Sequence, residues 1–164
     1  MNPSIFPGRY AARSANEFVL FRIGMRFNGR RGIVAALQTF AKMPAMLAEQ
    51  QAKPEIGMLS TSLSLSWPVI QITQFWRSFD DLERYATASE GQHTKAWRWF
   101  NKLERASEGT GVWHETYRIA PGSFEAIYVN MPRYGLAAAV DHVPVVPATA
   151  RARDRMNESV AQSS

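Results

Sequence analysis

Histidine is the residue type in this sequence that is best suited to acid–base or ligand chemistry. Two of the three histidines, His93 and His114, lie within residues 91–117, together with three of the five tryptophans. A neutral imidazole acts as a general base, a hydrogen-bond donor or a metal ligand. The chain has no cysteine, which excludes thiolate nucleophiles and cysteine-ligated metals. With three histidines and no H-x-x-x-H spacing, a zinc site on a helix is not expected.

His93 is expected to lie on the buried face of a helix. Ser89 and Gln92 match the S-x-x-Q capping box, so a helix is predicted to begin here. His93, Trp97 and Phe100 follow at helical spacing and share one face. On that face His93 would enter a cleft between helix and sheet, where desolvation lowers the pKa of an imidazole. The alternative is a histidine at the edge of the core, bonded to a backbone carbonyl.

His114 and Glu115 are neighbours on a predicted strand, residues 111–120, and therefore point to opposite faces of a sheet. We expect the face that carries Trp113 and Tyr117 to lie toward the helices, because it holds the larger aromatic side chains. This places Glu115 in the cleft as a second catalytic candidate, and His114 on the far side. One strand does not determine which of its faces is buried, so the reverse assignment stays open.

Aromatic and amide side chains complete the predicted site. Tyr85 lies on the apolar side of a short helix, and Trp76 ends the strand before that helix. On the last predicted strand, neutral hydrogen-bonding groups share one face. The expected substrate-binding residues are Tyr85, Trp97, Phe100, Trp76, Tyr128 and Asn130.

The junction between strand and helix at residues 77–81 has a clear capping pattern. Ser78 is predicted to be the N-cap, with acidic residues in the first helical turn, where the helix dipole favours them. Arg77 has the geometry to hold a carboxylate ligand, but we expect it to form a structural ion pair with Asp80, Asp81 or Glu83 instead.

The hydrophobic pattern predicts the order β-α-β-β-α-β followed by one more strand. This is a ferredoxin-like α+β fold, in which an antiparallel sheet carries helices on one face. Residues 1–16 are predicted to be an extended leader, residues 17–135 the ferredoxin-like domain, and residues 136–164 a C-terminal arm with a flexible tail. Strands are expected at residues 17–28, 56–67, 69–78, 111–120 and 123–132, and helices at 32–51, from 78 and from 89.

The first predicted strand has two different faces. One face is wholly apolar and should lie under the helices; it carries Val19, Phe21, Ile23, Met25 and Phe27. The other face carries Arg22 and Arg26, beside the serines of the second strand, and nothing in the chain is expected to cover it. Two copies pairing through this face would form a homodimer.

Composition excludes several classes of protein. The net charge is +5, but no run of Lys or Arg is long enough for a basic arm, so nucleic-acid binding is not expected. No apolar run spans a bilayer, and the N-terminus lacks the apolar core of a secretory signal, which predicts a cytoplasmic protein without a membrane partner. Dinucleotide, P-loop and G-x-S-x-G motifs are absent from the sequence.

Six sequence segments together resemble those of a known family: IFPGRY, EFVLFRIGMRFN, QFWRSFDDLERYA, HTKAWRWFNK, GVWHETY and IYVNMP. Over roughly residues 4–135 the chain is similar to small bacterial monooxygenase-like proteins of the dimeric α/β-barrel superfamily, which includes the antibiotic-biosynthesis monooxygenases. The resemblance implies a homodimer with a site between sheet and helices. Some members of the superfamily oxygenate aromatic substrates without a cofactor. Others, such as aldoxime dehydratases and dye-decolorising peroxidases, hold haem through a histidine.

Three functions are therefore weighed. The first is a monooxygenase-like enzyme for a small apolar or aromatic molecule, with His93 and Glu115 as catalytic residues and no cofactor. The second is a haem-dependent enzyme, with haem b held by His93 or His114. The third is a non-catalytic protein that binds such a molecule.

Overall fold

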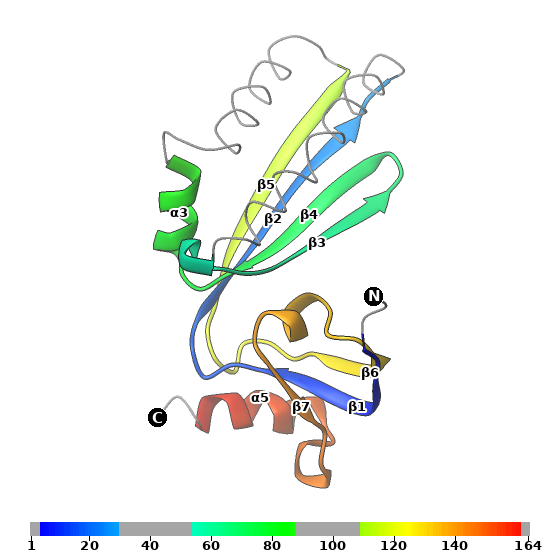
Figure 1. Cartoon of the computed structure of the whole chain (residues 1–164), viewed down its shortest axis with the longest axis vertical. Coiled ribbons are helices and arrows are strands. Elements are labelled where there is room, and N and C mark those ends of the chain that lie inside the picture. The colour runs from blue at the N-terminus through cyan, green and yellow to red at the C-terminus, as the bar shows by residue number, and fades with distance from the viewer. Residues whose placement is uncertain (1–3, 30–53, 88–108, 162–164) are drawn as a thin grey trace.

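The computed structural model describes residues 4–29, 54–87 and 109–161, which form two antiparallel sheets with short helices (Figure 1). The strands are β1 (Phe6–Arg13), β2 (Phe18–Phe27), β3 (Met58–Ser66), β4 (Val69–Trp76), β5 (Thr110–Ile119), β6 (Ile127–Met131) and β7 (Asp141–Pro144). The helices are α3 (Phe79–Thr87) and α5 (Ala152–Ala161), and the 3-10 turns are η1 (Pro54–Ile56), η2 (Gly135–Ala138) and η3 (Pro147–Thr149).

The larger sheet has the strand order β3-β4-β2-β5, with every pair antiparallel. With α3 between β4 and β5, this order is that of a ferredoxin-like fold, so the predicted α+β class is confirmed. The helix predicted from Ser78 is present as α3. The helices predicted at residues 32–51 and from residue 89 lie outside the described residues.

Strand pairing assigns the residues of the larger sheet to two faces. We call one the helix-side face, because Leu82 of α3 packs there against Val19 and Trp76. The other is called the opposite face. The helix-side face includes Val19, Phe21, Ile23 and Met25 of β2, Gln74 and Trp76 of β4, Thr61, Leu63 and Leu65 of β3, and His114 and Thr116 of β5. The opposite face includes Arg22 and Gly24 of β2, Gln71 and Thr73 of β4, four serines of β3, and Trp113, Glu115 and Tyr117 of β5.

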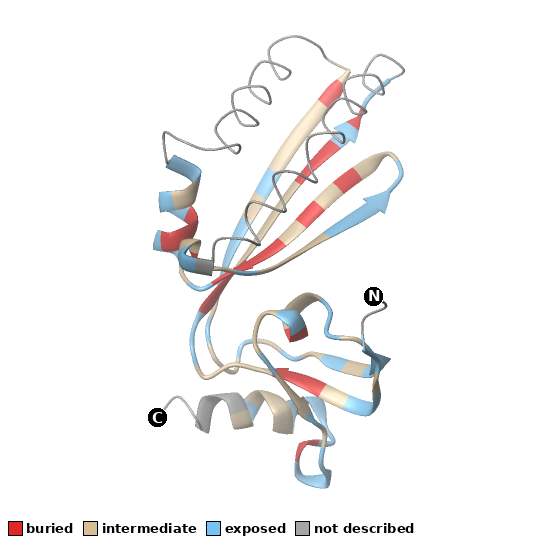
Figure 2. Cartoon of the chain, viewed as in Figure 1, coloured by how far each residue is buried: buried red, intermediate tan, exposed pale blue. Residues whose placement is uncertain are grey.

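Burial agrees with the predicted faces of β2. Val19, Met25 and Phe27 are buried on the helix-side face, and Arg26 on the opposite face is exposed. Buried and partly buried residues alternate along β4, as Figure 2 shows. The apolar face of the first predicted strand therefore points toward α3, as its pattern indicated.

A second, smaller sheet has the order β6-β1-β7. It differs from the expectation for both chain ends, because β1 lies in the segment predicted to be a leader, and β7 and α5 lie in the segment predicted to be an arm and tail. The additional strand β6 exists, but it pairs with β1 instead of extending the larger sheet. Pairing between β1 and β7 joins segments far apart in the chain, which local sequence patterns do not reveal.

The turn η2 connects the two sheets and lies between them (Figure 1). Ala137 in this turn is fully buried, and its N–H donates to the hydroxyl oxygen of Tyr128 in β6 at 3.2 Å. Toward the larger sheet, Ser60 Oγ donates to the carbonyl oxygen of Gly135 at 3.1 Å. The smaller sheet thus reaches the opposite face near one end of β3. On the other side of the smaller sheet, Arg13 pairs with Glu158 of α5 at 3.2 Å.

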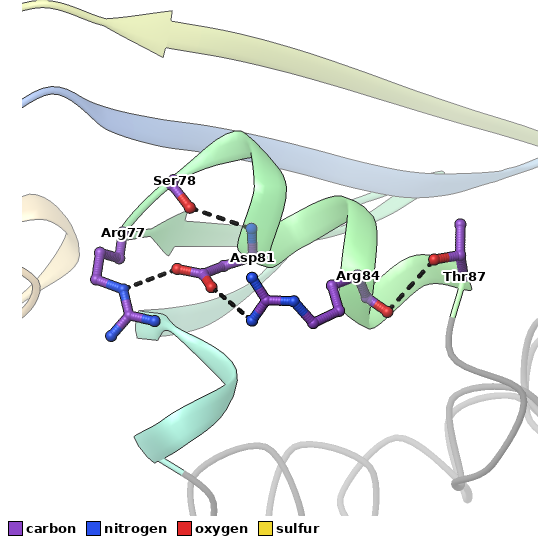
Figure 3. Close-up of polar contacts among 5 residues, drawn as sticks. All are labelled: Arg77, Ser78, Asp81, Arg84 and Thr87. Atoms are coloured by element: carbon purple, nitrogen blue, oxygen red, sulfur yellow. Dashed lines mark hydrogen bonds and ion pairs between the residues drawn. The ribbon is translucent and has the colours of Figure 1, made fainter.

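An ion-pair cluster fixes α3 to the end of β4 (Figure 3). Asp81 is buried, and its carboxylate accepts hydrogen bonds from Arg77 Nε at 2.8 Å and Arg84 Nη1 at 3.1 Å. Its N–H donates to Ser78 Oγ at 3.1 Å, which confirms Ser78 as the N-cap. The structural ion pair predicted for Arg77 is also confirmed. The hydrogen bond from Arg77 holds the pKa of Asp81 below its usual value, although burial acts in the other direction.

Glycine is required at position 57, because the backbone there lies against the carboxylate of Asp81. The φ of Gly57 is +84°, a backbone conformation that side chains with a Cβ rarely adopt, and an added Cβ would lie 2.5 Å from Asp81 Oδ2. The carbonyl oxygen of Gly57 also accepts a hydrogen bond from the N–H of Arg77 at 2.8 Å. The cluster therefore positions α3 over Trp76 through both backbone and side-chain contacts.

Candidate functional site

The helix-side face beneath α3 brings together two of the predicted site residues. The ring of Trp76 is fully buried and its centroid lies 5.2 Å from that of Tyr85 on α3. Trp76 Nε1 donates to Gln74 Oε1 at 3.2 Å, and Gln74 is itself buried. Phe21 packs against the same cluster from β2. The result is an aromatic surface with one buried amide.

His114 lies on this same helix-side face. It is opposite Ile23 in the pairing of β2 with β5, and its ring centroid is 6.0 Å from that of Phe21. The side chain is exposed, and within the described ranges its imidazole forms no hydrogen bond. The expectation that His114 lies on the far side of the sheet is therefore wrong, and the reverse assignment holds.

Glu115 consequently points away from the helix-side face. Its Oε2 accepts hydrogen bonds from Arg22 Nη1 at 2.8 Å and from the Tyr117 hydroxyl at 3.0 Å. The hydrogen bond to Glu115 raises the pKa of Tyr117. Glu115 was predicted to lie in a cleft on the helix side, and the structure places it on the opposite face instead. Arg22 on β2 could have indicated this face for Glu115, because a carboxylate on the neighbouring strand pairs with an arginine.

The faces of β5 were predicted wrongly, because its large aromatic side chains were expected to lie toward the helices. Trp113 lies on the opposite face, directly over Gly24, where an added Cβ would be 2.6 Å from the indole ring. The guanidinium of Arg22 is 5.3 Å from the centroid of that ring. Here the aromatic residue packs on a glycine and a cation instead of entering the core.

Tyr128 and Asn130 lie in the smaller sheet, away from the helix-side face. Asn130 has a φ of 52°, and its side-chain carbonyl accepts a hydrogen bond from the N–H of Gly8 at 2.8 Å. The hydroxyl of Tyr128 accepts from Ala137, and burial raises the pKa of Tyr128. Both contacts join segments of the smaller sheet. His93, Trp97 and Phe100 lie outside the described residues.

Two polar groups that sequence reasoning did not select also stand out. Thr61 on the helix-side face has a buried Oγ1 without a hydrogen-bond partner. In the smaller sheet, both ring nitrogens of His142 are buried without partners, and its ring is 4.5 Å from Tyr10 and 4.8 Å from Phe6 between centroids. Burial lowers the pKa of His142. The segment of His142 was predicted to lack regular structure, so nothing in the sequence pointed to it.

The described part of the chain contains no group of three or more His, Asp or Glu side chains that would hold a metal ion by themselves. A haem iron needs one strong protein donor, and an unbonded, exposed imidazole on an aromatic surface has the right donor chemistry. His114 therefore fits the role of such a ligand. Among the described residues, no helix has both the length and the apolar character needed to cross a bilayer.

The fold and this site place the chain in a class of small ferredoxin-like proteins whose aromatic sheet face lies under a helix. Residues 18–136 match the model of the monooxygenase af470-like family, and the chain belongs to that family. No curated protein matches the sequence.

Solved structures share the fold at low sequence identity. An aldoxime dehydratase in complex with butyraldoxime superposes with a TM-score of 0.63 at 16% identity, over 98% of this chain and 44% of the dehydratase chain. The present chain thus spans less than half the length of that enzyme. A protein from Deinococcus radiodurans that is assigned to the antibiotic biosynthesis monooxygenases has a TM-score of 0.42 at 11% identity, over 62% of this chain and 92% of its own. The protein Rv0793 from Mycobacterium tuberculosis has a TM-score of 0.43 at 16% identity, over 60% of this chain and 92% of its own.

Proposed function

We propose that this protein is a monooxygenase-type oxidoreductase that binds a small apolar, aromatic molecule on the helix-side face. The single observation that carries the proposal is the imidazole of His114, which lies beside Phe21 and has no hydrogen-bond partner among the residues that the structure describes. Aromatic side chains favour a flat apolar substrate, and a few polar groups among them orient it. Membership of the monooxygenase af470-like family supports the type of reaction.

In this proposal His114 is the group that moves a proton. Its imidazole accepts a proton from an activated carbon or hydroxyl of the substrate, and the resulting anion adds through carbon to dioxygen to form a peroxide, which takes the proton back. Loss of water from this hydroperoxide leaves a carbonyl, so one oxygen atom enters the product and the other leaves as water. The partly buried rings of Tyr85 and Phe21 contact the aromatic body of the substrate, and the fully buried Trp76 packs behind Tyr85. His93, predicted from the sequence to reach the same cleft, is a second candidate for the base. Glu115 is not retained, since it is already engaged by Arg22 and Tyr117.

A haem-dependent reaction is the second candidate. The similarity to an aldoxime dehydratase over nearly the whole chain favours it, together with the unpartnered imidazole of His114. His114 or His93 would hold the iron, and Tyr85 and Phe21 would contact the apolar part of a substrate. Haem supplies a Lewis-acidic, redox-active iron when it is bound.

The two candidates are separated by spectra and oxygen consumption. Purified protein is scanned before and after addition of haem, and the wild type is compared with His114→Ala and His93→Ala. Thr116→Ala, on the same face of the same strand, is the matched control. A Soret band that shifts in one histidine variant supports the haem reaction. Oxygen uptake with an aromatic substrate and no Soret band, lost in His114→Ala, supports the cofactor-free reaction.

Each remaining outcome has a defined meaning. Saturable binding of aromatic compounds without turnover, with or without haem, would identify a ligand-binding protein and contradict both enzymatic candidates. Equal oxygen uptake by wild type and His114→Ala would contradict the role of His114.

We also propose a homodimer that forms through the part of the opposite face that η2 leaves uncovered. Arg22 there contacts both Glu115 and Trp113, so a second copy can pack on this surface without leaving the charges of Arg22 and Glu115 unpaired. Light scattering after size-exclusion chromatography would give twice the chain mass. Arg22→Glu places two carboxylates together and is expected to yield the monomer. A wild-type monomer at micromolar concentration would contradict the proposal.

A further inference from the structure

One row of residues interrupts the apolar character of the helix-side face. Strand pairing aligns Thr61 with Gln74, Gln74 with Phe21, and Phe21 with Thr116. The next row toward the β3–β4 turn holds Leu63, Ile72, Ile23 and His114. The hydroxyl of Thr61 is therefore a polar group at the edge of an apolar surface.

The Thr61 hydroxyl lacks the hydrogen bond that a buried polar atom normally has. Its Oγ1 is inaccessible to solvent, and no group in residues 4–29, 54–87 or 109–161 forms a hydrogen bond with it. Burying a hydroxyl without a partner costs stability, so such groups are uncommon in folded proteins. By contrast Thr73, on the opposite face of the neighbouring strand, accepts a hydrogen bond from Gln71 Nε2 at 2.9 Å. Thr61 is thus in a position where a ligand atom would complete its bonding.

The leucines beside Thr61 form apolar surface that the described residues leave exposed. Leu63 and Leu65 point to the helix-side face, yet they are 39% and 66% exposed. Serines occupy the other face of β3, so the strand has one apolar and one small, polar side. An exposed apolar strip with a polar group at its end has the composition of a ligand subsite.

The sheet order sets the distance between this strip and His114. β3 and β5 are the two outer strands, separated by β4 and β2. At about 4.8 Å per strand, they lie roughly 14 Å apart across the sheet. A molecule that contacts both must therefore be elongated, about the length of three or more connected rings.

We propose that the helix-side face of β3 binds the far end of the substrate, and that Thr61 Oγ1 makes a hydrogen bond to an oxygen there. This inference rests on the proposed function, because it takes His114 as the reacting end. The substrate class that follows is an elongated apolar molecule with a hydroxyl or carbonyl oxygen remote from the reacting atom. Leu63 and Leu65 contact its apolar body, and Thr61 determines which end binds over β3.

Binding of two matched compounds tests the role of Thr61. The probes are 2-hydroxyanthracene and 2-methylanthracene, which have nearly the same shape, and binding is followed by quenching of tryptophan fluorescence. Thr61→Val keeps the shape and removes the hydroxyl, whereas Thr61→Ser keeps the hydroxyl. We expect Thr61→Val to weaken binding of the hydroxy compound about 2- to 10-fold and to leave the affinity for the methyl compound unchanged. Thr61→Ser should still bind the hydroxy compound more tightly than Thr61→Val does.

Thermal unfolding without ligand tests whether the hydroxyl serves folding instead. Because Thr61 Oγ1 has no partner, Thr61→Val should leave Tm unchanged or raise it by up to about 4 °C. Thr73→Val removes the acceptor of Gln71 and is expected to lower Tm. A clear drop in Tm for Thr61→Val would mean that the hydroxyl is bonded in the folded protein, and would overturn the inference.

The failure of this inference is distinguishable from failure of the proposed function. If both probes bind, and His114→Ala abolishes turnover while Thr61→Val changes neither affinity, the site stands and the subsite on β3 is wrong. If wild type binds neither probe, the proposed function fails, and the inference fails with it. Leu65→Gln, which makes the strip more polar, should weaken the binding of both probes. Ser64→Ala, on the other face of β3, should leave the affinity for both probes unchanged.

Discussion

The two faces of the larger sheet are built from the same four strands, yet they treat polar groups differently. On the opposite face, polar side chains satisfy one another: Arg22 donates to Glu115 and to Gln71, and Gln71 donates to Thr73. On the helix-side face, the hydroxyl of Thr61 and the imidazole of His114 have no hydrogen-bond partner in the described parts of the chain. A paired network contributes structure, whereas an unpaired donor on an aromatic surface is available for a ligand.

This difference also explains why residue type alone does not identify the site. The opposite face holds a glutamate, an arginine and an exposed tyrosine, which are side chains that often take part in catalysis. Each of them is engaged by a neighbour. The helix-side face has fewer polar groups, and two of them, Thr61 and His114, are distinguished by having no hydrogen-bond partner in the described parts of the chain. Four mutational tests separate the two faces, ordered from the largest expected loss of stability to the smallest.

Gly57→Ala should disrupt the cover of the helix-side face most strongly. The new Cβ would lie 2.5 Å from Asp81 Oδ2, and alanine disfavours the positive φ that this position has, so α3 must shift from Trp76. We expect a loss of about 2 to 4 kcal/mol in the free energy of unfolding. Gly8→Ala is the matched control, because its φ of +95° is similar but its surroundings are open. Equal losses in urea denaturation would show that the contact with Asp81 is unimportant.

Asp81→Asn should weaken the same cover without a steric clash. The amide cannot replace a buried carboxylate bonded to Arg77 and Arg84, and the expected loss is about 1 to 3 kcal/mol. Because the folded-state pKa of Asp81 is lowered, its contribution is complete above the unfolded value of about 3.9 and is lost as the pH falls through the lower folded value. Unfolding of wild type and Asp81→Asn between pH 7 and pH 2 should therefore converge at low pH. A constant difference across this range would contradict the ion-pair account.

A double-mutant cycle on Arg22 and Glu115 tests whether the opposite face is a paired network. Both side chains are partly exposed, so we expect a coupling energy of about 0.5 to 1 kcal/mol, with no change in ligand affinity. The pair Arg118–Glu17 is the control, because Arg118 is more exposed and the expected coupling is smaller. If Glu115→Ala abolished turnover with unchanged stability, Glu115 would belong to the site after all.

His114→Ala should have the smallest effect on stability and the largest effect on function. The side chain is exposed and has no hydrogen bond to lose, so the change in unfolding free energy should stay within about 0.5 kcal/mol. Turnover should fall about a hundredfold or more if its imidazole moves the proton. Thr116→Ala, two residues along the same face, should change neither quantity. A large loss of stability in His114→Ala would assign this residue to the fold.

The periodicity of the sequence was sufficient to predict the buried face of a strand or helix that had one clearly apolar side. The faces of β2, the N-cap at Ser78 and the ion pair of Arg77 were all predicted correctly. Each depends on residues within a few positions of one another. The ferredoxin-like order followed from the same local patterns.

Features that depend on distant partners were not predictable in this way. The face of β5 was inverted, because tryptophan and tyrosine pack equally well on a buried core or on a glycine beside an arginine. The smaller sheet was missed, because β1 contains proline and glycine and pairs with strands near the other end of the chain. The missing hydrogen bond of Thr61 is a property of three-dimensional packing and has no signal in the sequence.

The most direct test of the central claim is an NMR titration of the full chain with 2-hydroxyanthracene. The signals to follow are the Thr61 methyl group and the His114 imidazole on the helix-side face, and the Trp113 indole and Thr73 methyl group on the opposite face. We predict that the first two shift together along one saturable curve and that the last two stay in place. Shifts confined to Trp113 and Thr73 would place the ligand on the paired network and contradict the account.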